Sequence, residues 1–164
     1  MSLDIFWFLR CFSHLQYFSF TQIPSSSLSY VGYEDSASHH TRHIASAAWV
    51  LYTPESDLLG SGGIFLCNAT NNVAEYMSVI QLLMEAVSCD ISNLVVRLDS
   101  QLVIMQLRNH YRVRHPVLLH YFLRVRLLER QFQTITFEHV PREFNALANS
   151  LANYVLDLHL SHLL

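Results

Sequence analysis

The sequence contains no lysine, few charged residues and no long apolar run. Charged side chains make up 14% of the 164 residues and hydrophobic ones 51%, whereas roughly a quarter of an ordinary globular chain is charged. This composition excludes intrinsic disorder as the main state, because enough apolar area is available to offset the loss of chain entropy. No stretch approaches the ~18 consecutive apolar residues of a membrane-spanning helix. We therefore expect one compact soluble domain without a membrane partner.

Cysteine is also scarce. Cys11, Cys67 and Cys89 are odd in number and include no close pair, which argues against a disulfide framework and against a cysteine zinc site. A signal peptide fits the first residues poorly, since Asp4 precedes a short apolar run and no small-residue cleavage site follows closely. These features predict a reducing compartment, the cytosol or the nucleus.

Positive charge comes from arginine alone and is unevenly distributed. The net charge is −3, which argues weakly against a general nucleic-acid binder. Yet six of the ten arginines lie between positions 108 and 130, where Glu129 is the only acid: Arg108, Arg112, Arg114, Arg124, Arg126 and Arg130. This stretch is either a phosphate-contacting patch or an arginine-rich, solvated helix face, and composition alone does not decide between them.

The chain divides into three parts. Residues 1–27 are rich in aromatic side chains and end in Pro24 and three serines, a pattern typical of a linker. We interpret them as an N-terminal extension to which the sequence assigns no role. Residues 28–158 form the expected domain, and 159–164 a short tail.

Periodicity within the domain predicts an α/β fold. Alternating or β-branched runs indicate strands over residues 28–33, 44–53, 58–66, 93–98 and 134–140. Apolar residues at helical spacing indicate four helices: one after the asparagines at 71 and 72, one over 101–107, one opened by Pro116 with a stripe reaching Phe132, and one over 143–158. The order βββαβααβα predicts a mixed sheet with helices.

Three acidic residues fall where such a fold concentrates chemistry. Asp35 and Asp99 follow the first and fourth strands, and Glu75 lies early in the first helix. If the strand ends open on one crevice, the three carboxylates form a like-charge cluster that needs cations. Oxygen ligands select Mg²⁺ or Mn²⁺, and paired ions serve phosphodiester cleavage. Spacing alone equally allows Asp99 to cap a helix and Asp35 to lie in a turn.

Four strings in this order favour the first interpretation. They are Thr-Asn-Asn-Val-Ala-Glu-Tyr at 70–76, Leu-Asp-Ser-Gln-Leu at 98–102, Glu-His-Val-Pro-Arg-Glu at 138–143, and Asn145 followed by Leu-Ala-Asn at 151–153. Together they resemble the ribonuclease H type 1 family, and within it the domains of plant gypsy-class retrotransposon polyproteins and related stand-alone plant proteins. The likeness extends from about residue 28 to residue 157.

The resemblance implies a ribonuclease H-like fold, a five-stranded mixed sheet with helices on both sides, and metal-dependent hydrolysis of the RNA strand of RNA–DNA hybrids. By position, Asp35, Glu75 and Asp99 match the family's catalytic carboxylates, which hold two Mg²⁺ or Mn²⁺ ions. His139 matches a histidine that assists proton transfer or product release. The expected nucleic-acid contacts are Thr70, Asn71, Asn72 and Gln101, together with Arg108, Arg112 and Arg114 of the basic stretch.

Two positions depart from the family pattern. The fourth metal-site carboxylate falls on Asn149, four residues after Asn145, so one ligand brings no negative charge. We expect this to impair catalysis rather than abolish it. Asp35 is preceded by Glu34 and followed by Ser36, where the family has glycine, and a positive φ there would strain serine and misaim the aspartate.

Other interpretations stay open. A hybrid- or RNA-binding module that no longer cuts, derived from a decayed retroelement, is the alternative to an enzyme, and a non-functional fragment is a third. His39, His40 and His43 could hold zinc but lack a fourth ligand. We expect a monomer.

Overall fold

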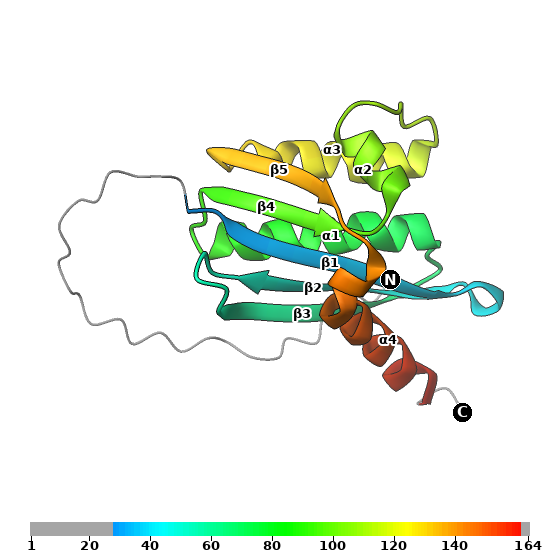
Figure 1. Cartoon of the computed structure of the whole chain (residues 1–164). Coiled ribbons are helices and arrows are strands. Elements are labelled where there is room, and N and C mark those ends of the chain that lie inside the picture. Colours follow the sequence, from blue (N-terminus) through cyan, green and yellow to red (C-terminus); the bar gives the residue numbers. More distant parts are fainter. Residues whose placement is uncertain (1–27, 162–164) are drawn as a thin grey trace, which may run out of the picture.

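The structure is a computed structural model that describes residues 28–161. Five strands and four α-helices follow one another in the order βββαβααβα (Figure 1), with short 3₁₀ turns after β1 and before α4. The strands are β1 (Tyr30–His39), β2 (Ile44–Tyr52), β3 (Leu58–Cys67), β4 (Asn93–Leu98) and β5 (Thr134–His139). The helices are α1 (Asn71–Ser88), α2 (Gln101–Leu107), α3 (Pro116–Glu129) and α4 (Ala146–Ser161). The expected extension and the last three residues of the expected tail lie outside the described residues.

All five strands form one mixed sheet in the order β3-β2-β1-β4-β5. β1 runs antiparallel to β2 and parallel to β4, and β4 is also parallel to β5. The predicted fold class is therefore confirmed. β1 and β4 lie at the centre, so the residues at their carboxyl ends meet in the middle of the sheet.

Helices cover both faces. A Cβ atom added at Gly32 of β1 would lie 2.6 Å from Leu82 Cδ2 of α1, so α1 packs closely on one face. A Cβ atom added at Gly63 of β3 would lie 2.7 Å from Val155 Cγ2 of α4, which covers the other. The main core lies on the α1 side, where α3 packs on α1. Among the described elements, α4 alone lies on the other face and extends over only part of it (Figure 1).

β1 is longer than the sequence predicts. The expected strand ends at residue 33, but β1 continues to His39 because it pairs with β2 along its whole length, including Asp35 with Ala48 and Ser36 with Ala47. Ser36 is not among the described residues with positive φ. The positive φ that would have strained serine is therefore absent at this position, because Ser36 lies in a regular strand.

The helix starts differ from the predictions by a few residues. α1 begins at Asn71 rather than after Asn72, because the Thr70 hydroxyl accepts a hydrogen bond from the Val73 amide over 3.3 Å. Ser100, not Asp99, caps α2, which frees the Asp99 carboxylate. α4 begins at Ala146 after a 3₁₀ turn instead of at residue 143. Among the described helices, none combines the length and the apolar character needed to cross a membrane.

Candidate active site

Asp35 and Asp99 lie beside each other on neighbouring strands. The parallel register of β1 and β4 pairs Tyr33 with Arg97. Asp35 lies two residues further along β1, and Asp99 directly follows Leu98, the last residue of β4. The proximity is also electrostatic, since the charge of Asp99 raises the pKa of Asp35 more than any other charge does. Asp35 is thus fixed by its strand pairing with Ala48 of β2, and Asp99 is placed by the end of β4.

Glu75 reaches the same place from α1. Its Oε2 accepts a hydrogen bond from the Ser100 hydroxyl over 2.6 Å, and its Oε1 accepts one from Asn71 Nδ2 over 2.7 Å. Asn71 in turn accepts a hydrogen bond from the Ser38 hydroxyl of β1 over 3.2 Å. A chain of hydrogen bonds therefore connects β1, α1 and the residue after Asp99, and it fixes the direction of the Glu75 carboxylate.

Crowding and burial raise the pKa values of these acids. Desolvation, and then the charge of Asp99, raise the pKa of Asp35 to about 7, while the Ser36 amide and the Arg142 guanidinium act in the opposite direction. Desolvation also raises the pKa of Glu75, against the hydrogen bonds from Ser100 and Asn71. Perturbed carboxyl groups gathered in this way are characteristic of functional sites.

Glu34 adds a fourth carboxyl group behind the cluster. It is 1% exposed and accepts a hydrogen bond from the Ser78 hydroxyl of α1. Burial, followed by the charges of Glu75, Asp35 and Asp99, raises its pKa well above the ordinary value. The Glu34 backbone carbonyl accepts a hydrogen bond from Asn145 Nδ2 over 2.7 Å, which ties β1 to the turn before α4.

The donor set suits a hard divalent cation, although the carboxylates are turned toward hydrogen-bond donors. Asp35 Oδ2 is buried without a hydrogen-bond partner, while its Oδ1 accepts from the Ser36 amide over 2.7 Å. A cation would satisfy that oxygen and relieve the mutual repulsion of the acids. Within residues 28–161, no three His, Cys, Asp or Glu side chains are arranged so that they could hold a metal ion as they stand. The zinc alternative at His39, His40 and His43 stays a prediction, because the side chain of His40 lies outside the part of the chain that the structure describes.

His139 ends β5 beside the aspartates. The strand register pairs it with Leu98, and its Nε2 lies 3.2 Å from the backbone oxygen of Asp99. The ring is exposed. Its position therefore fits a group that exchanges protons with solvent near the cluster.

Asn149 lies near the start of α4, where its side-chain amide accepts hydrogen bonds from neighbouring residues. Its Oδ1 accepts hydrogen bonds from Asn153 Nδ2 over 2.6 Å and from Arg142 Nη2 over 3.4 Å. The Arg142 charge also lowers the pKa of Asp35, against the larger effect of burial. The Arg142 guanidinium therefore interacts both with the neutral amide of Asn149 and with the charge of Asp35.

The expected nucleic-acid contacts fall into two groups. Thr70 and Gln101 are exposed at the starts of α1 and α2, and Asn72 is half-buried near Thr70. Asn71, by contrast, uses both atoms of its amide inside the protein, on Glu75 and on Ser38. In this structure it positions a carboxylate.

The arginines of residues 108–130 also fall into two groups, those with contacts inside the protein and those that are exposed. Arg108 Nε donates a hydrogen bond to the Phe137 carbonyl over 2.8 Å, and Arg126 pairs with Glu129 at 2.7 Å and also donates to the Leu107 carbonyl. These two hold α2, α3 and β5 together. Arg112 and Arg114 are exposed in the segment between α2 and α3, where they are available to phosphates.

Sequence reasoning missed three residues around the cluster. Ser100 and Ser78 hold carboxyl groups, and Arg142 places a positive charge near Asp35. Ser100 follows Asp99 directly and Arg142 lies in the 138–143 string, so both stood within strings that the sequence singles out. Nothing in the spacing marks Ser78.

Comparison with known proteins gives one family for most of the chain. The model of a family described as "Reverse transcriptase-like" matches residues 33–155. The matched part contains all three acidic residues, His139 and Asn149.

Individual relatives agree with that match. The chain is 38% identical over 109 residues to the "Bifunctional protein Rv2228c" of Mycobacterium tuberculosis; the match takes in 66% of this chain but 30% of that longer protein. A crystal structure of RNase H1 from the halophilic archaeon Halobacterium salinarum superimposes with a TM-score of 0.76 at 35% identity, covering 79% of this chain and 98% of that one. LC11-RNase H1, solved in complex with RNA/DNA hybrid, gives a TM-score of 0.75 at 27% identity, covering 80% and 99%.

Proposed function

Because the chain belongs to the reverse transcriptase-like family and has the ribonuclease H fold, we propose that it is an endonuclease that hydrolyses the RNA strand of RNA–DNA hybrids. Its relatives support this proposal at the level of the family: they include an RNase H1 of 35% identity and an RNase H1 bound to RNA/DNA hybrid. The chain spans about 30% of the mycobacterial protein it matches, so any activity of such a longer protein is a separate proposal.

One observation supports the proposal most strongly. Asp35, Asp99 and Glu75 come from β1, the end of β4 and α1, and they influence one another electrostatically. Asp35 keeps a buried, unpartnered oxygen. Burying like charges costs several kcal/mol unless a cation or proton compensates them. Such an arrangement is expected where a protein binds cations for chemistry.

In the proposed enzyme, Asp35, Glu75 and Asp99 would hold Mg²⁺ or Mn²⁺, with the Asn149 amide oxygen as a neutral fourth ligand. When bound, a pair of such ions supplies an activated water and stabilises the leaving oxygen. The ligand distances that these ions need are short, so Glu75 and Asp35 would have to exchange some of their present hydrogen bonds for the metal.

The chain's own side chains would perform the remaining tasks. Ser100 and Asn71 hold the Glu75 carboxylate in one orientation, which is the role of outer-shell residues at metal sites. His139, exposed and 3.2 Å from the Asp99 carbonyl, would move a proton between the reacting phosphate and solvent. Arg142 would steady Asn149 and reduce the negative charge that the cluster presents to an incoming phosphate.

The hybrid would lie across the starts of α1 and α2. Thr70, Asn72 and Gln101 are placed there to contact phosphate and the minor groove with its 2′-hydroxyls. Arg112 and Arg114 would add phosphate contacts beyond α2. We propose Asn71 for this surface too, although its main contacts in this structure are internal.

A second candidate function follows from Asn149. Since that position brings an amide, and Arg142 lies beside it, the protein would hold cations less strongly than a site with four carboxylates. The expected result is weakened cleavage. At the extreme, the protein would be a module that grips hybrids or RNA without cutting them.

Origin, assembly and location are part of the same proposal. The resemblance to plant gypsy-class retrotransposon domains rests on the four sequence strings, whereas the relatives named above are bacterial and archaeal. We propose a retroelement-derived domain that acts as a monomer in the cytosol or nucleus.

The proposal is tested with the purified full chain on an RNA–DNA hybrid labelled on the RNA strand. With Mg²⁺ or Mn²⁺, the wild type should release shortened RNA, and the Asp99→Asn variant should not. Double-stranded DNA should stay intact. If the two proteins release equal amounts of product, or none, the enzyme assignment is contradicted. Salt-dependent binding of the hybrid without cleavage would instead support the binding module.

A further inference from the structure

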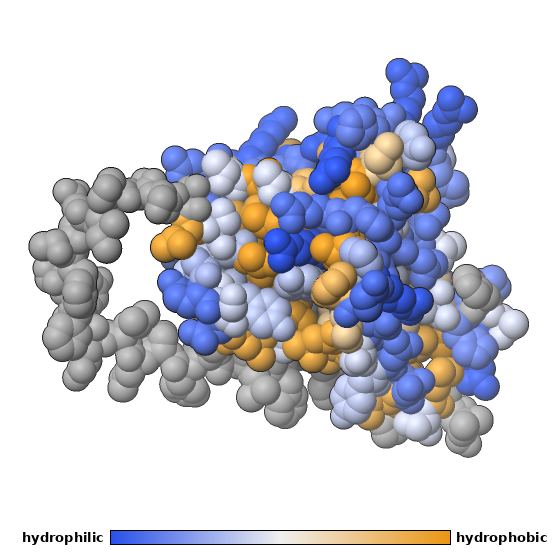
Figure 2. Space-filling model, in the orientation of Figure 1, coloured by the Kyte–Doolittle hydropathy of each residue, from blue (hydrophilic) through white to orange (hydrophobic). Residues whose placement is uncertain are grey.

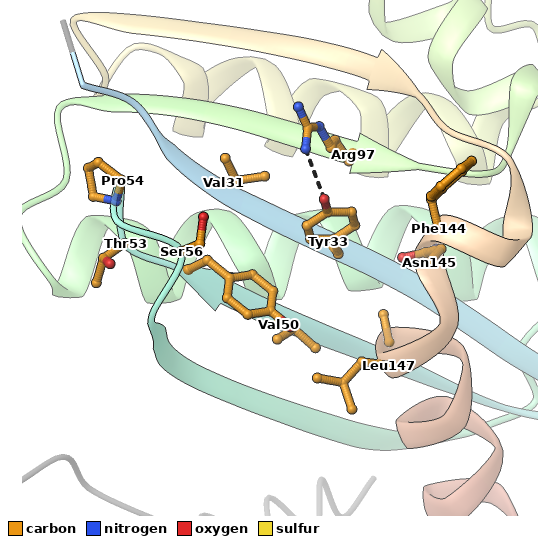
Figure 3. A pocket seen from close by; sticks show the side chains of 12 residues that line it. Val31, Tyr33, Val50, Thr53, Pro54, Ser56, Arg97, Phe144, Asn145 and Leu147 are labelled. Carbon is orange, nitrogen blue, oxygen red and sulfur yellow. Dashed lines mark hydrogen bonds between the residues drawn. The ribbon is translucent and has the colours of Figure 1, made fainter.

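A groove opens on the sheet face that carries α4. Its volume is about 280 Å³, and it lies between the sheet, the turn after β2 and the start of α4 (Figure 3). The lining is mainly apolar and aromatic, with Val31, Tyr33, Tyr52, Phe144 and Leu147 among its residues. Because side chains alternate along a strand, Val31, Tyr33 and Asp35 of β1 share this face. The groove is therefore adjacent to the candidate active site but distinct from it.

The rim of the groove exposes large apolar side chains to solvent. Phe144 is 68% exposed and Leu147 51%, and both stand where α4 begins. On the floor, the rings of Tyr33 and Tyr52 meet edge to face with centroids 5.8 Å apart. Figure 2 shows apolar surface on this side of the molecule. Apolar surface gathered around a hollow marks a binding surface more often than solitary exposed residues do.

The groove is electrically neutral. Its only charged lining residue is Arg97, whose Nε lies 3.0 Å from Glu138 Oε2 and whose Nη1 donates to the Tyr33 hydroxyl over 2.8 Å. A nucleic acid would require unpaired positive charge, and an acidic peptide would require the same. The surface therefore suits an uncharged, aromatic or aliphatic occupant.

The chain itself contains a segment of that chemistry. Residues 1–27 precede the described part and carry seven aromatic residues in their first twenty positions: Phe6, Trp7, Phe8, Phe12, Tyr17, Phe18 and Phe20. Asp4 and Arg10 are their only side chains that are charged at pH 7 with histidine counted as neutral, and the two charges balance each other. Removing large apolar side chains from water is favourable, so such a segment is stabilised by an apolar surface within its reach.

That surface is within reach. The described chain begins at Leu28, and Val31, three residues later, already lines the groove. The eight residues from Phe20 to Ser27 can span at most about 29 Å when extended, which is longer than a hollow of about 280 Å³ is wide. A short tether also raises the local concentration of the segment to the millimolar range, above that of any separate partner at ordinary protein concentrations.

We propose that the aromatic N-terminal segment, residues 6–20, binds in cis in the groove formed by Tyr33, Tyr52, Phe144 and Leu147. The segment covers the open face of the sheet beside α4 and shields Phe144 and Leu147 from solvent. This proposal is independent of catalysis, because none of these groove residues belongs to the acidic cluster.

A photo-crosslinker in the full chain tests the proposal directly. Phe144 is replaced by the photoreactive amino acid benzoylphenylalanine. After irradiation, crosslinked monomers and dimers are separated by size, and the linked peptides of each are identified. Linkage to peptides within residues 1–27 of the same chain is expected. The matched control places the same amino acid at Leu123, which is 52% exposed on α3 and lies outside the groove lining. It should give no linkage to that segment.

Other outcomes overturn the proposal. Linkage between two chains would show that a second copy of the chain occupies the groove. Absence of linkage at position 144 would show that residues 6–20 do not bind there. Hydrogen exchange provides an independent readout in the full chain with all seven aromatic residues changed to serine. Amides of residues 144–148 should exchange at least several-fold faster than in wild type, whereas unchanged exchange contradicts occupancy. A control variant with Ser2, Ser13 and Ser19 changed to asparagine should behave as wild type.

Discussion

Arg142 Nη2 lies 3.4 Å from Asn149 Oδ1, at the position where the family resemblance predicts a fourth metal-binding carboxylate. The pair places a positive charge and a neutral amide where a negative charge was expected. Arg142 also acts on Asp35, whose pKa it lowers against the effect of burial. The proposed weakness of the enzyme can therefore be attributed to one side chain and its partner.

Restoring the carboxylate should strengthen the site. In Asn149→Asp, the added negative charge attracts a divalent cation, and we expect the Mg²⁺ concentration for half-maximal cleavage to fall about tenfold, equivalent to ~1.4 kcal/mol. The gain is limited because Arg142 would pair with the new aspartate. Cleavage measured across a Mg²⁺ series tests this. The matched Ser150→Asp variant adds the same charge at the next residue of α4, which is exposed, and should change little; equal effects of the two variants would contradict a specific role for position 149.

Removing the partner of Glu75 should loosen the cluster. Ser100→Ala deletes the hydroxyl that donates to Glu75 Oε2 over 2.6 Å, and loss of an outer-shell partner typically costs 10–100-fold in metal affinity or activity. The variant also loses the α2 cap, worth about 1 kcal/mol, so stability must be measured alongside. Ser100→Thr keeps the hydroxyl and should retain most activity. If the alanine variant cleaves as well as wild type at low Mg²⁺, the orienting role is wrong.

The raised pKa values of Asp35 and Glu75 predict how the stability of the protein depends on pH in the absence of divalent cations. An unfolded aspartate titrates near 3.9, and folding raises the pKa of Asp35 to about 7. The folded state therefore binds this proton more tightly than the unfolded state does. Its contribution to the free energy of unfolding is fully present below pH 4 and is lost as the pH rises through 7. The pKa of Glu75 is raised as well, so it acts in the same direction.

We expect the free energy of unfolding in EDTA to fall by a few kcal/mol between pH 4.5 and pH 8. Urea denaturation across that range measures it. Asp35→Asn should reduce the slope of the profile, because the amide does not titrate, while Glu34 and Glu75, whose pKa values are also raised, keep the remainder. Mg²⁺ in excess should restore stability at pH 8, by about 2.7 kcal/mol at a hundredfold excess over its dissociation constant. Stability that rises over this range in EDTA would contradict the burial of repelling carboxyl groups.

Arginines of the basic stretch should separate into binding and structural residues. Arg112→Ala and Arg114→Ala should each weaken hybrid binding and reduce the slope of log affinity against log salt by roughly one, as expected for a phosphate contact. Arg108→Ala should mainly lower stability, since its guanidinium is held by the Phe137 carbonyl. Fluorescence anisotropy at several salt concentrations, with thermal melts, distinguishes the two. Equal salt slopes in all three variants would refute the division.

The sequence predicted the order of elements because apolar periodicity changes sharply between strands and helices. It placed Asn93–Leu98 and Gln101–Leu107 at their observed bounds. It ended β1 too early, since Glu34, Asp35 and Ser36 are polar and look like a turn. In the structure all three are buried by pairing with β2 and by α1 and α4, which only tertiary packing can decide.

The candidate site was predictable in its residue types but not in its contacts. The sequence motifs pointed to Glu75 and Asp99, and the position after the first predicted strand pointed to Asp35. The fold brings the elements that carry these three residues together. Hydrogen bonding between Asn71 and Glu75, four residues apart on one helix face, was not deduced from the same string, because the resemblance assigned Asn71 to nucleic acid. Arg108 was likewise assigned by charge alone, while its partner, Phe137, lies on β5 far along the chain.

The central claim is that Asp35, Glu75 and Asp99 bind divalent cations together. The most direct measurement is a crystal structure of the protein soaked in Mn²⁺, with the ions located by anomalous scattering. The account predicts at least one ion in contact with oxygens of Asp35 and Asp99, with the Glu75 carboxylate turned from Ser100 toward it, and a second, weaker ion near Asn149. A map with no ion among these three side chains at millimolar Mn²⁺, and with Glu75 still bound to Ser100, would contradict it.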